Sequence, residues 1–462
     1  MHPGSVTTPP RISRKRPGAG GHWNVGGSRW HSCGTSWAER GGYGQPLAGF
    51  LASGRHLAPS RLPPHHARYS PRLTRTDPDE ATSQSRDEQE MGMVRYMSGV
   101  GFLLLLALGA PGCAVDSPEP EGDLPTFRAD PDWPRPFAEN WVLGAVTGIA
   151  VDARDHVWVT HSPSGGGGAA FGAAQDPPIS TCCVPAPDVI EFDPDGNVVQ
   201  AWVMDGDGYE WPSIPHGIFV DHTDHVWIGS RPNHQLLKFN RDGDLVLTIG
   251  ELGVSGGSND PDRLGTPADM WVSPETNEVF VADGYGNRRI IVFDGDTGAY
   301  LRHWGAYGEV PDDDYEYGPR GADEPPARQF GTAHGIVGSR DGLLYLADRR
   351  NNRVQVFQQD GTFVAERLVA PETLSSGSAH DVALSADADQ RFLYLMDGVN
   401  HRIWILQRHD LEVVGHFGQG GYQLGQFIRP HNMDSDSRGN IYSSEAETQR
   451  VQRFLVQGAG AP

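Results

Sequence analysis

The chain has little cysteine. Its 462 residues include four, Cys33, Cys113, Cys182 and Cys183. Four cysteines spread over this length do not make a disulfide framework, and none of them has the CxxC spacing of a metal site. The adjacent pair Cys182 and Cys183 either forms a vicinal disulfide or packs as free thiols. We expect free thiols.

The sequence also lacks an apolar run long enough to span a bilayer. The run Val100–Ala110 follows Arg95 and precedes Cys113. About 11 residues fall short of the roughly 20 that a membrane-spanning helix needs, but they suit the hydrophobic part of a secretory signal. We therefore assign residues 91–113 to a signal peptide. Its function requires translation to start near Met91.

The small residues before Cys113 resemble a bacterial lipobox, although Pro111 is an unusual occupant. If Cys113 is lipidated, the protein is a lipoprotein that contacts the membrane through this anchor. If it is not, cleavage nearby releases the protein. In both cases we expect an exported protein in the periplasm, in the cell envelope or outside the cell.

Positive charge is in short supply. The formal net charge is −22, and the acidic excess lies beyond residue 90. A folded part this acidic repels phosphates, which excludes nucleic acid as a partner.

Residues 1–90 lack any sustained hydrophobic period and are rich in Gly, Pro, Arg, Ser and His. Such a composition does not bury enough apolar surface to offset the entropy of ordering. We expect a disordered N-terminal extension, or an upstream segment included through a mis-assigned start codon. Residues 114–137 are rich in Pro and acid and are predicted to be a linker. Residues 457–462 form a short tail.

Residues 138–456 contain one pattern six times, in which a short apolar run is followed by an Asp/Gly turn and a second apolar run. Aligned on one column, the copies have Thr147, His216, Ala268, His334, His380 and His431 at the equivalent position. The base period is about 45–50 residues, which is typical of propellers and solenoids. Each copy holds about four short strands, as in Arg289–Phe293 and Tyr300–Trp304, and four strands make one propeller blade. The predicted fold class is all-β, a six-bladed β-propeller.

The first strand of each blade lines the central channel of a propeller. His216, His334 and His431 occupy the same column of blades 2, 4 and 6. Alternate blades of six lie about 120° apart, so the three imidazoles are expected to converge on the axis. Three imidazoles with an open fourth position are the ligand set of catalytic zinc. His380 of blade 5 breaks the threefold pattern; it is a structural or second-shell residue, or an extra ligand.

A second column, after the second strand of each blade, lies at the rim of the same funnel. The Asp residues in it are expected to hold turns, with Asn287, Asn352 and Asn400 in similar roles. Large polar residues there are not needed by a turn. Tyr285 beside a dication can act as a base. Arg349 and Arg231 offer bidentate forks for a carboxylate.

The blades resemble NHL repeats, and the propeller is similar to the peptidyl-α-hydroxyglycine α-amidating lyases and their bacterial relatives. The resemblance covers the whole propeller and none of residues 1–113. It is carried by Pro215-His216-Gly217, Asp283-Gly284-Tyr285-Gly286-Asn287-Arg288, Ala333-His334-Gly335, Ala347-Asp348-Arg349 with Asn352-Arg353, and Pro430-His431-Asn432.

That resemblance implies a zinc enzyme that cleaves the N–C bond of a C-terminal peptidyl-α-hydroxyglycine to give a peptide amide and glyoxylate. His216, His334 and His431 match the zinc ligands, Tyr285 the catalytic tyrosine and Arg349 one of two active-site arginines.

The chain departs from the family at Ser162 and Asn432, and Gly286 stands where the vertebrate members have a Cys after the tyrosine. The second arginine is replaced by Ser162, and Arg231 lies in the same rim column one blade on. Asn432 stands where the family has an Asp with a role in a structural calcium site, although an amide oxygen still ligates calcium. A copper monooxygenase half is not part of this sequence.

Two other functions remain open. NHL propellers also serve as non-catalytic binding scaffolds, and the loss of an arginine fits that role. A lactone hydrolase of the gluconolactonase type is the third, although such sites use carboxylates and amides around calcium. For the lyase, the expected partner is a small molecule or a peptide C-terminus with a carboxylate. We expect a monomer.

Overall fold

A computed structural model of the chain describes residues 11–13, 124–137, 139–164, 172–204 and 208–458. All of these belong to one compact unit made of residues 1–19 and 117–462. The described residues do not include the predicted signal peptide 91–113 with Cys113. Of residues 1–90 they include only Arg11–Ser13, so Cys33 is also outside them. The assignments that fall outside the described residues stay predictions.

Six sheets follow one another along the chain, and each is one blade of four strands; the sheet of blade 1 has β1 (Arg11–Ser13) as an additional fifth strand. Blade 1 contains β4 (Ala145–Val151), β5 (Val157–Ser162), β7 (Val189–Phe192) and β8 (Val198–Trp202). Blade 2 contains β9 (Pro215–Val220), β10 (Val226–Ser230), β11 (Gln235–Phe239) and β12 (Leu245–Ile249). Blade 3 contains β13 (Asp269–Val272), β14 (Glu278–Asp283), β15 (Arg289–Asp294) and β16 (Tyr300–Trp304).

Blade 4 contains β17 (Ala333–Gly338), β18 (Leu343–Asp348), β19 (Arg353–Gln358) and β20 (Phe363–Leu368). Blade 5 contains β21 (Asp381–Leu384), β22 (Phe392–Asp397), β23 (Arg402–Gln407) and β24 (Val413–Phe417). Blade 6 contains β25 (Pro430–Ser435), β26 (Ile441–Glu445) and β27 (Arg450–Gln457), with β2 (Thr126–Ala129) as its fourth strand.

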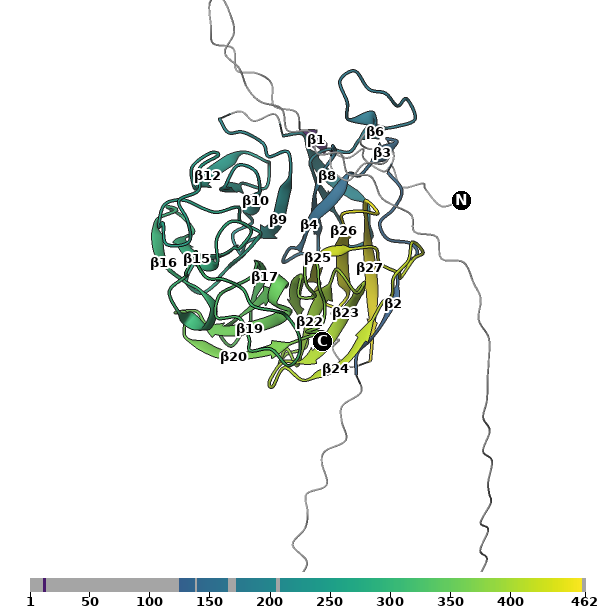
Figure 1. Ribbon diagram of the computed structural model, residues 1–462. Coiled ribbons are helices and arrows are strands. Elements are labelled where there is room, and N and C mark those ends of the chain that lie inside the picture. Colours follow the sequence, from purple (N-terminus) through teal and green to yellow (C-terminus); the bar gives the residue numbers. More distant parts are fainter. Residues whose placement is uncertain (1–10, 14–123, 138, 165–171, 205–207, 459–462) are drawn as a thin grey trace, which may run out of the picture. The chain divides into compact units, whose positions relative to one another are not determined.

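The inner strands β4, β9, β13, β17, β21 and β25 contact one another in succession, and β25 returns to β4. Figure 1 shows the blades arranged around this central axis. The predicted all-β, six-bladed propeller is confirmed. Outside the blades, β3 (Trp141–Val142) pairs with β6 (Val184–Pro185), and two short 3-10 helices, η1 (Ala306–Gly308) and η2 (Arg349–Asn351), lie in loops. No helix in the described part of the chain has the length and apolar character needed to cross a membrane.

A repeated aspartate explains the sharp turn between the first two strands of a blade. Asp152 accepts backbone N–H groups of Arg154 and His156 through Oδ1, and Trp158 Nε1 through Oδ2 at 3.1 Å. Asp221 and Trp227 repeat this bond at 2.8 Å one blade on. The side chain thus satisfies the turn's backbone donors and ties the turn to a buried tryptophan.

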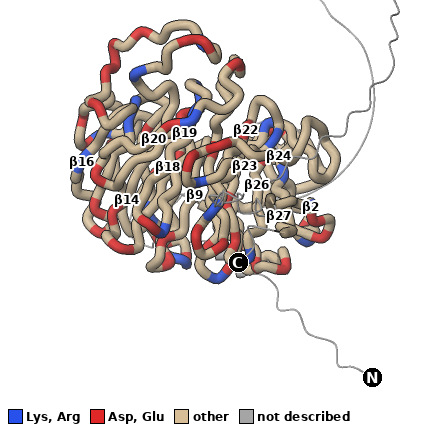
Figure 2. The backbone as a smooth tube through the Cα atoms, turned by 90° about the horizontal axis from the view of Figure 1, so that it is seen from below, with Lys and Arg blue, Asp and Glu red and all other residues tan. Residues whose placement is uncertain are grey.

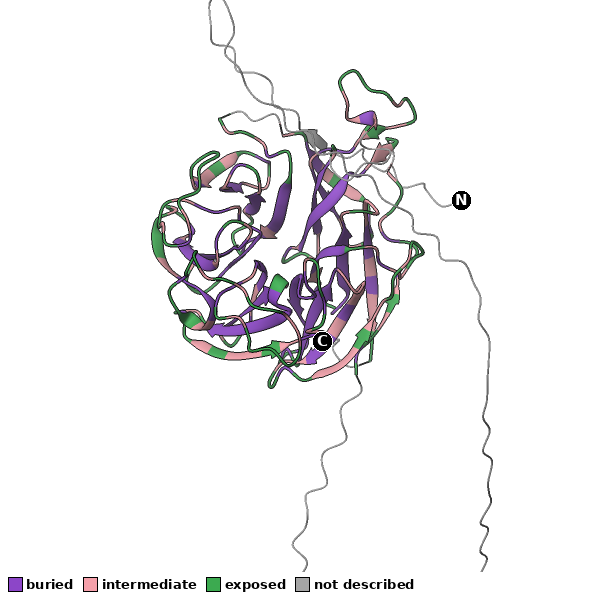
Figure 3. Ribbon diagram, in the orientation of Figure 1, coloured by how far each residue is buried: buried purple, intermediate pink, exposed green. Residues whose placement is uncertain are grey.

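The core lies between neighbouring blades, where the inner three strands of each sheet pack face to face. Figure 3 shows these strands buried, while the outermost strands alternate between covered and exposed residues. Trp158, Trp202 and Trp227 are among the largest fully buried side chains. Burying an aliphatic or aromatic side chain contributes about 1.5–3 kcal/mol, so many small inter-blade cores stabilise the ring.

The ring is closed by an N-terminal strand, which corrects the prediction that residues 114–137 are all linker. β2 pairs antiparallel with β27, the third strand of blade 6. Phe127 of β2 stacks on Phe417 with ring centroids 4.4 Å apart. Arg453 donates to Asp130 Oδ2 through Nε at 2.9 Å. The fourth strand of blade 6 therefore comes from the opposite end of the propeller sequence.

Two local predictions also change. Arg11–Ser13, inside the segment expected to be disordered, forms β1 and pairs in parallel with β8. β8 is the outer strand of its blade, and its edge offers unpaired backbone groups to such a partner. Cys182 and Cys183, expected as free thiols, are joined in a vicinal disulfide, and Ser180 Oγ lies 3.0 Å from Cys182 Sγ.

Candidate metal and active site

Three histidines stand at irregularities in the inner strands. In β17, Ala333 pairs with Asp348 and Gly335 with Ala347, so His334 is an extra residue on its strand. The pairing of β9 with β10 and of β25 with β26 shifts in the same way around His216 and His431. An extra residue bends the strand and re-aims its side chain, a device common beside functional sites.

In blades 2 and 4 the residue after the histidine must be small, because neighbouring inner strands approach closely there. A Cβ on Gly217 would lie 2.6 Å from the carbonyl oxygen of Ala268, and one on Gly335 would lie 2.1 Å from Asp381 Oδ1. Glycine therefore allows the close approach of neighbouring inner strands that brings the imidazoles together.

The structure brings His216, His334 and His431 to one point. Their ligand atoms all lie within 4.8 Å of one another. The ring centroids are 4.6 Å apart for His216 and His431, 5.1 Å for His334 and His431, and 5.2 Å for His216 and His334. All three side chains are buried. The metal role of the three stays a prediction.

Each of these rings is oriented by the backbone of the next blade. His216 Nδ1 lies 2.6 Å from the carbonyl oxygen of Ala268, and His334 Nδ1 lies 2.6 Å from that of His380. His431 Nδ1 lies 3.0 Å from the carbonyl oxygen of Thr147. A carbonyl only accepts, so each Nδ1 carries the proton and each Nε2 presents a lone pair. The three acceptors belong to the column residues of blades 3, 5 and 1.

Burial keeps the three imidazoles neutral. Desolvation lowers the pKa of His216 and of His334 well below the usual value, and the neighbouring imidazoles and Arg349 lower them further. The pKa of His431 is lowered to about 4, again chiefly by burial. Neutral imidazole is the form that binds a metal ion, so the site keeps its ligand form at and well below neutral pH.

Tyr285 places its hydroxyl beside the imidazoles. Its Oη lies 2.9 Å from His216 Nε2 and 3.0 Å from His334 Nε2. Arg349 donates from Nη1 to the same oxygen at 3.0 Å. The guanidinium carbons of Arg231 and Arg349 lie 4.1 and 4.9 Å from the ring centroid. Tyr285, Arg349 and Arg231 were all predicted from the sequence as site residues, and the structure brings them to the histidines.

The hydrogen-bond inventory of this centre is unbalanced. The Tyr285 hydroxyl has one hydrogen to give, while two Nε2 lone pairs lie within 3.0 Å of it and that of His431 faces the same region. At least one of the two lone pairs therefore receives no hydrogen from Tyr285. A cation is the partner that several converging lone pairs require, so the residues present fit a zinc ion with three protein ligands.

His380 and Ser162 lie outside this centre. The His380 ring is buried, and its Nδ1 lies 3.2 Å from the backbone N–H of Gly398. The centroid of the His380 ring is 5.8 Å from that of His334. The contact of His380 with the imidazole of His334 is made by its backbone carbonyl and not by its ring. The Ser162 hydroxyl donates to the carbonyl of Ser213 at 2.7 Å, so it is held away from the funnel.

Asn432 links a ligand histidine to a buried carboxylate. Its Oδ1 lies 2.7 Å from His431 Nδ1, and its Nδ2 donates to Asp381 Oδ2 at 3.1 Å. Asp381 also accepts the N–H of Met433 at 2.7 Å. Burial raises the pKa of Asp381 to about 7. An amide side chain both accepts from His431 and donates to Asp381 in this way. The sequence did not predict this link.

The aspartates of the rim column do hold turns. Asp283 accepts Gly265 N–H at 2.7 Å and Asn287 Nδ2 at 2.8 Å. In blade 4 the partner of Asp348 is Asn351, at 2.7 Å, whereas Asn352 donates to the carbonyls of Pro371 and Thr373. The expected role of Asn352 is therefore filled by the residue before it.

The chain is similar in sequence to several known proteins. A model described as NHL repeat matches residues 330–357, which include most of blade 4. The chain is 26% identical over 349 residues to "NHL repeat-containing protein 3" of Mus musculus, covering 73% of this chain and 86% of that protein. It is 25% identical over 355 residues to "Peptidyl-alpha-hydroxyglycine alpha-amidating lyase 1" of Drosophila melanogaster, covering 71% of this chain and 60% of that protein.

A third relative is the "Peptidylglycine alpha-amidating monooxygenase" of Rattus norvegicus, 24% identical over 367 residues. The match covers 75% of this chain and 33% of the monooxygenase, so the chain spans about a third of that relative's length. The resemblance expected from the sequence is confirmed: the chain is a six-bladed propeller with an NHL repeat, and its relatives include proteins named as amidating lyases and as NHL repeat-containing proteins.

Proposed function

We propose that the protein is a zinc-dependent lyase that cleaves the N–C bond of C-terminal peptidyl-α-hydroxyglycine to give a peptide amide and glyoxylate. The observation that carries the proposal is the convergence of three imidazole lone pairs with the Tyr285 hydroxyl and the Arg349 guanidinium at one end of the channel. Relatives named as amidating lyases support the reaction class.

The metal in this proposal is held by His216, His334 and His431. Zinc bound by three imidazoles supplies Lewis acidity toward the substrate hydroxyl. The backbone carbonyls of Ala268, His380 and Thr147 accept the Nδ1 protons and so fix the imidazole tautomers, as hydrogen-bond partners do for metal-ligating histidines.

In the proposed reaction Tyr285 accepts the proton of the substrate hydroxyl. The C–O bond becomes the aldehyde of glyoxylate, the C–N bond breaks, and the amide nitrogen takes up a proton, so atoms balance without an oxidant. The N–H donated by Arg349 to Tyr285 Oη stabilises the negative charge on the phenolate oxygen while Tyr285 acts as a base.

Arg231 and Arg349 hold the substrate carboxylate. Both guanidiniums lie over the faces of the Tyr285 ring, which places two forks beside the reacting centre. Ser162 stands where the related lyases have their second arginine, and its hydroxyl is bonded to the backbone of Ser213. In this proposal Arg231 binds the carboxylate in place of that arginine. Bidentate guanidinium–carboxylate pairs both bind and orient, which is what a bond-breaking step in a small substrate requires.

A non-catalytic binding propeller is the second candidate. The buried Ser162 in place of an arginine favours it, as does the relative named only for its NHL repeats. In that case the funnel binds a carboxylate without turning it over.

Glyoxylate release separates the two. Zinc-loaded protein is incubated with N-benzoyl-α-hydroxyglycine, and glyoxylate is measured with and without a chelator. We expect turnover that the chelator abolishes and added zinc restores, and no turnover in His334→Ala. Binding of the substrate by zinc-loaded wild type without glyoxylate release would replace the lyase by the scaffold.

Export through residues 91–113 belongs to the same proposal, with Cys113 as the lipid anchor. Expression from Met91, followed by mass spectrometry of the mature N-terminus, tests it. A mature protein that begins at a diacylated Cys113 supports the anchor, and a full-length cytoplasmic product removes it.

A further inference from the structure

Four arginines beside the funnel have no carboxylate partner among the residues that the structure describes, although the chain carries a net charge of −22. They are Arg231, Arg288, Arg349 and Arg350. Figure 2 shows acidic residues spread over the loops of the propeller. Other arginines pair with carboxylates, as Arg241 does with Asp152 at 2.8 Å, or donate to backbone carbonyls, as Arg340 does to Asp387 at 2.9 Å.

The four lie over two tyrosine rings, and each tyrosine with its two arginines forms one stack. Arg231 and Arg349 lie over Tyr285 in the site already described. Arg288 and Arg350 lie over Tyr317, both with guanidinium carbons 5.0 Å from the ring centroid. The stacks are neighbours in the chain, since Arg288 comes three residues after Tyr285 and Arg350 directly follows Arg349. The proposed lyase mechanism uses the first stack and leaves the second without a role.

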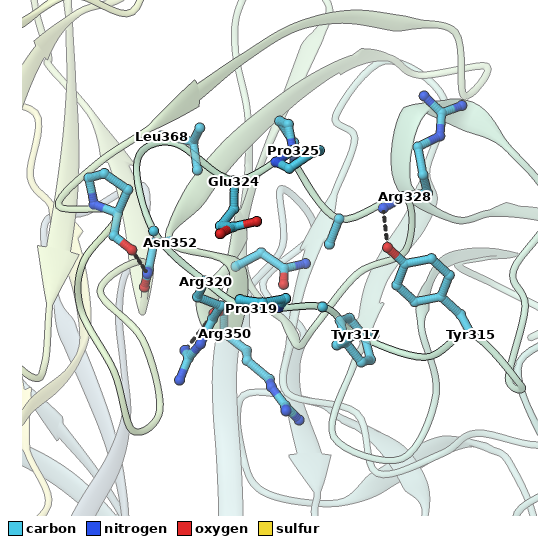
Figure 4. A pocket seen from close by; sticks show the side chains of 16 residues that line it. Tyr315, Tyr317, Pro319, Arg320, Glu324, Pro325, Arg328, Arg350, Asn352 and Leu368 are labelled. Carbon is cyan, nitrogen blue, oxygen red and sulfur yellow. Dashed lines mark hydrogen bonds between the residues drawn. The ribbon is translucent and has the colours of Figure 1, made fainter.

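Tyr317 and Arg350 of the second stack line a cavity of about 350 Å³, whereas Arg288 donates to the backbone carbonyl of Asp312. The loop between η1 and β17 forms most of the cavity wall, with Tyr317, Pro319 and Pro325, and Arg350 lines it from η2. Figure 4 shows these side chains around the cavity, together with Arg320 and Glu324. Rings and prolines form rigid walls, and the volume suits one amino-acid side chain with its backbone.

The loop that forms the cavity is fixed to the propeller. Arg320 donates from Nη1 to the carbonyl of Arg350 at 2.8 Å, and the Tyr317 hydroxyl donates to the carbonyl of Phe330. Arg328 N–H donates to Tyr315 Oη at 3.1 Å. The guanidinium of Arg320 donates hydrogen bonds to backbone carbonyls, whereas the side chain of Arg350 is exposed and, within the described part of the chain, has its donors free for a ligand. Arg350 is therefore the cation that this cavity offers to a ligand.

We propose that this cavity is a subsite for an acidic side chain in the residue directly before the C-terminal hydroxyglycine of the substrate. The proposal rests on the proposed function and adds a substrate class to it. Arg349 lies in the site over Tyr285, and the next residue, Arg350, lines the cavity, so the cavity adjoins the place where the terminal carboxylate binds. Arg349 binds the terminal carboxylate, and Arg350 binds the side-chain carboxylate through charge-assisted hydrogen bonds.

The test compares N-acetyl-Glu-α-hydroxyglycine with N-acetyl-Gln-α-hydroxyglycine, which differ in one charge. In wild type we expect kcat/KM for the Glu substrate to be about tenfold higher, with the difference in KM. Arg350→Gln brings the ratio close to one, because KM for the Glu substrate rises toward KM for the Gln substrate. The control Arg367→Gln removes the same charge from β20 of the same blade and keeps the ratio, which separates a local contact from the general field of the protein.

Equal kcat/KM for the two substrates in wild type, or a preference that survives Arg350→Gln, overturns the subsite and leaves the lyase standing. If neither substrate turns over, calorimetry with the unreactive N-acetyl-Glu-Gly and N-acetyl-Gln-Gly decides. Tighter binding of the Glu compound that is lost in Arg350→Gln keeps the subsite while the lyase falls. Equal binding rejects the subsite as well.

Discussion

The Nδ1 atom of His334 lies 2.6 Å from the backbone carbonyl oxygen of His380. This one contact gives His380 a place in the site without its imidazole. The ring of His334 is turned by a residue of the next blade, and the same relationship joins His216 to Ala268 and His431 to Thr147. The side chains that supply the carbonyls differ, so the contact depends on backbone geometry, and each of these three blades orients the ligand of its neighbour.

Metal content should therefore respond to the ring of His334 and not to that of His380. We expect about one zinc per chain in wild type and almost none in His334→Ala, because three imidazoles with one removed no longer make the ligand set of a stable site. His380→Gln should keep its zinc, since the carbonyl remains. Elemental analysis of the purified proteins measures this, with circular dichroism to check folding. Zinc loss in a folded His380→Gln protein would make its ring a ligand.

Replacing Tyr285 by Phe should remove catalysis and keep the metal. The change deletes the hydroxyl that lies 3.0 Å from His334 Nε2 and accepts from Arg349. Loss of a positioned base costs about 10²–10⁴-fold in kcat. Steady-state glyoxylate release measures the loss, and Tyr300→Phe on the outer strand β16 serves as the matched control. A variant with near wild-type kcat would show that another group takes the proton.

Restoring an arginine at position 162 should not help. Ser162 is 1% exposed, and its hydroxyl bonds to the carbonyl of Ser213. A longer charged side chain there has no room and no carboxylate partner, so we expect Ser162→Arg to destabilise the fold by about 3 kcal/mol or more. Ser162→Ala should cost only about 1 kcal/mol. Chemical denaturation measures both, and a stable Ser162→Arg protein with higher kcat/KM would reverse this reading.

Much of the fold could be predicted because its information is local. Blades 1, 2 and 6 repeat an Asp-stabilised turn with a buried Trp or Tyr in register, as with Asp152 and Trp158. The other blades repeat the apolar runs, so one alignment yields six blades. The closing strand was missed for the opposite reason. Thr126–Ala129 is short, sits among prolines and acidic residues, and pairs with a strand more than 300 residues away. Nothing in its own sequence records that partner.

The same distinction holds for the candidate site: features carried by the repeat could be predicted, and features that depend on contacts between distant residues could not. The histidine column could be read from the repeat, and Tyr285, Arg349 and Arg231 from their size at rim positions. The carbonyls that orient the rings could not, because Thr147, Ala268 and His380 share only a backbone atom in this role. The stack around Tyr317 could not either, since the loop that carries it has no period. The doublet Arg349-Arg350 was the one signal available for it.

The last prediction concerns Asn432, whose amide lies between His431 Nδ1 and Asp381 Oδ2. Asn432→Asp removes the donor and sets a second carboxylate against a buried one, so at least one of the pair must keep a proton. Burial already raises the pKa of Asp381 to about 7. A raised carboxyl pKa contributes stability that is present below the unfolded value of about 4 and is lost as pH rises through the folded value.

Asn432→Asp should therefore resemble wild type in stability near pH 4 and fall behind it increasingly as pH rises toward 8, by about 2–4 kcal/mol. Denaturant unfolding at several pH values measures this loss. The double variant Asp381→Asn, Asn432→Asp exchanges the donor and the carboxylate and should recover most of the stability at pH 8. A single variant that loses equally at all pH values, or a double variant that is no better, would show that the lost packing of the amide, rather than the paired carboxylates, sets the cost.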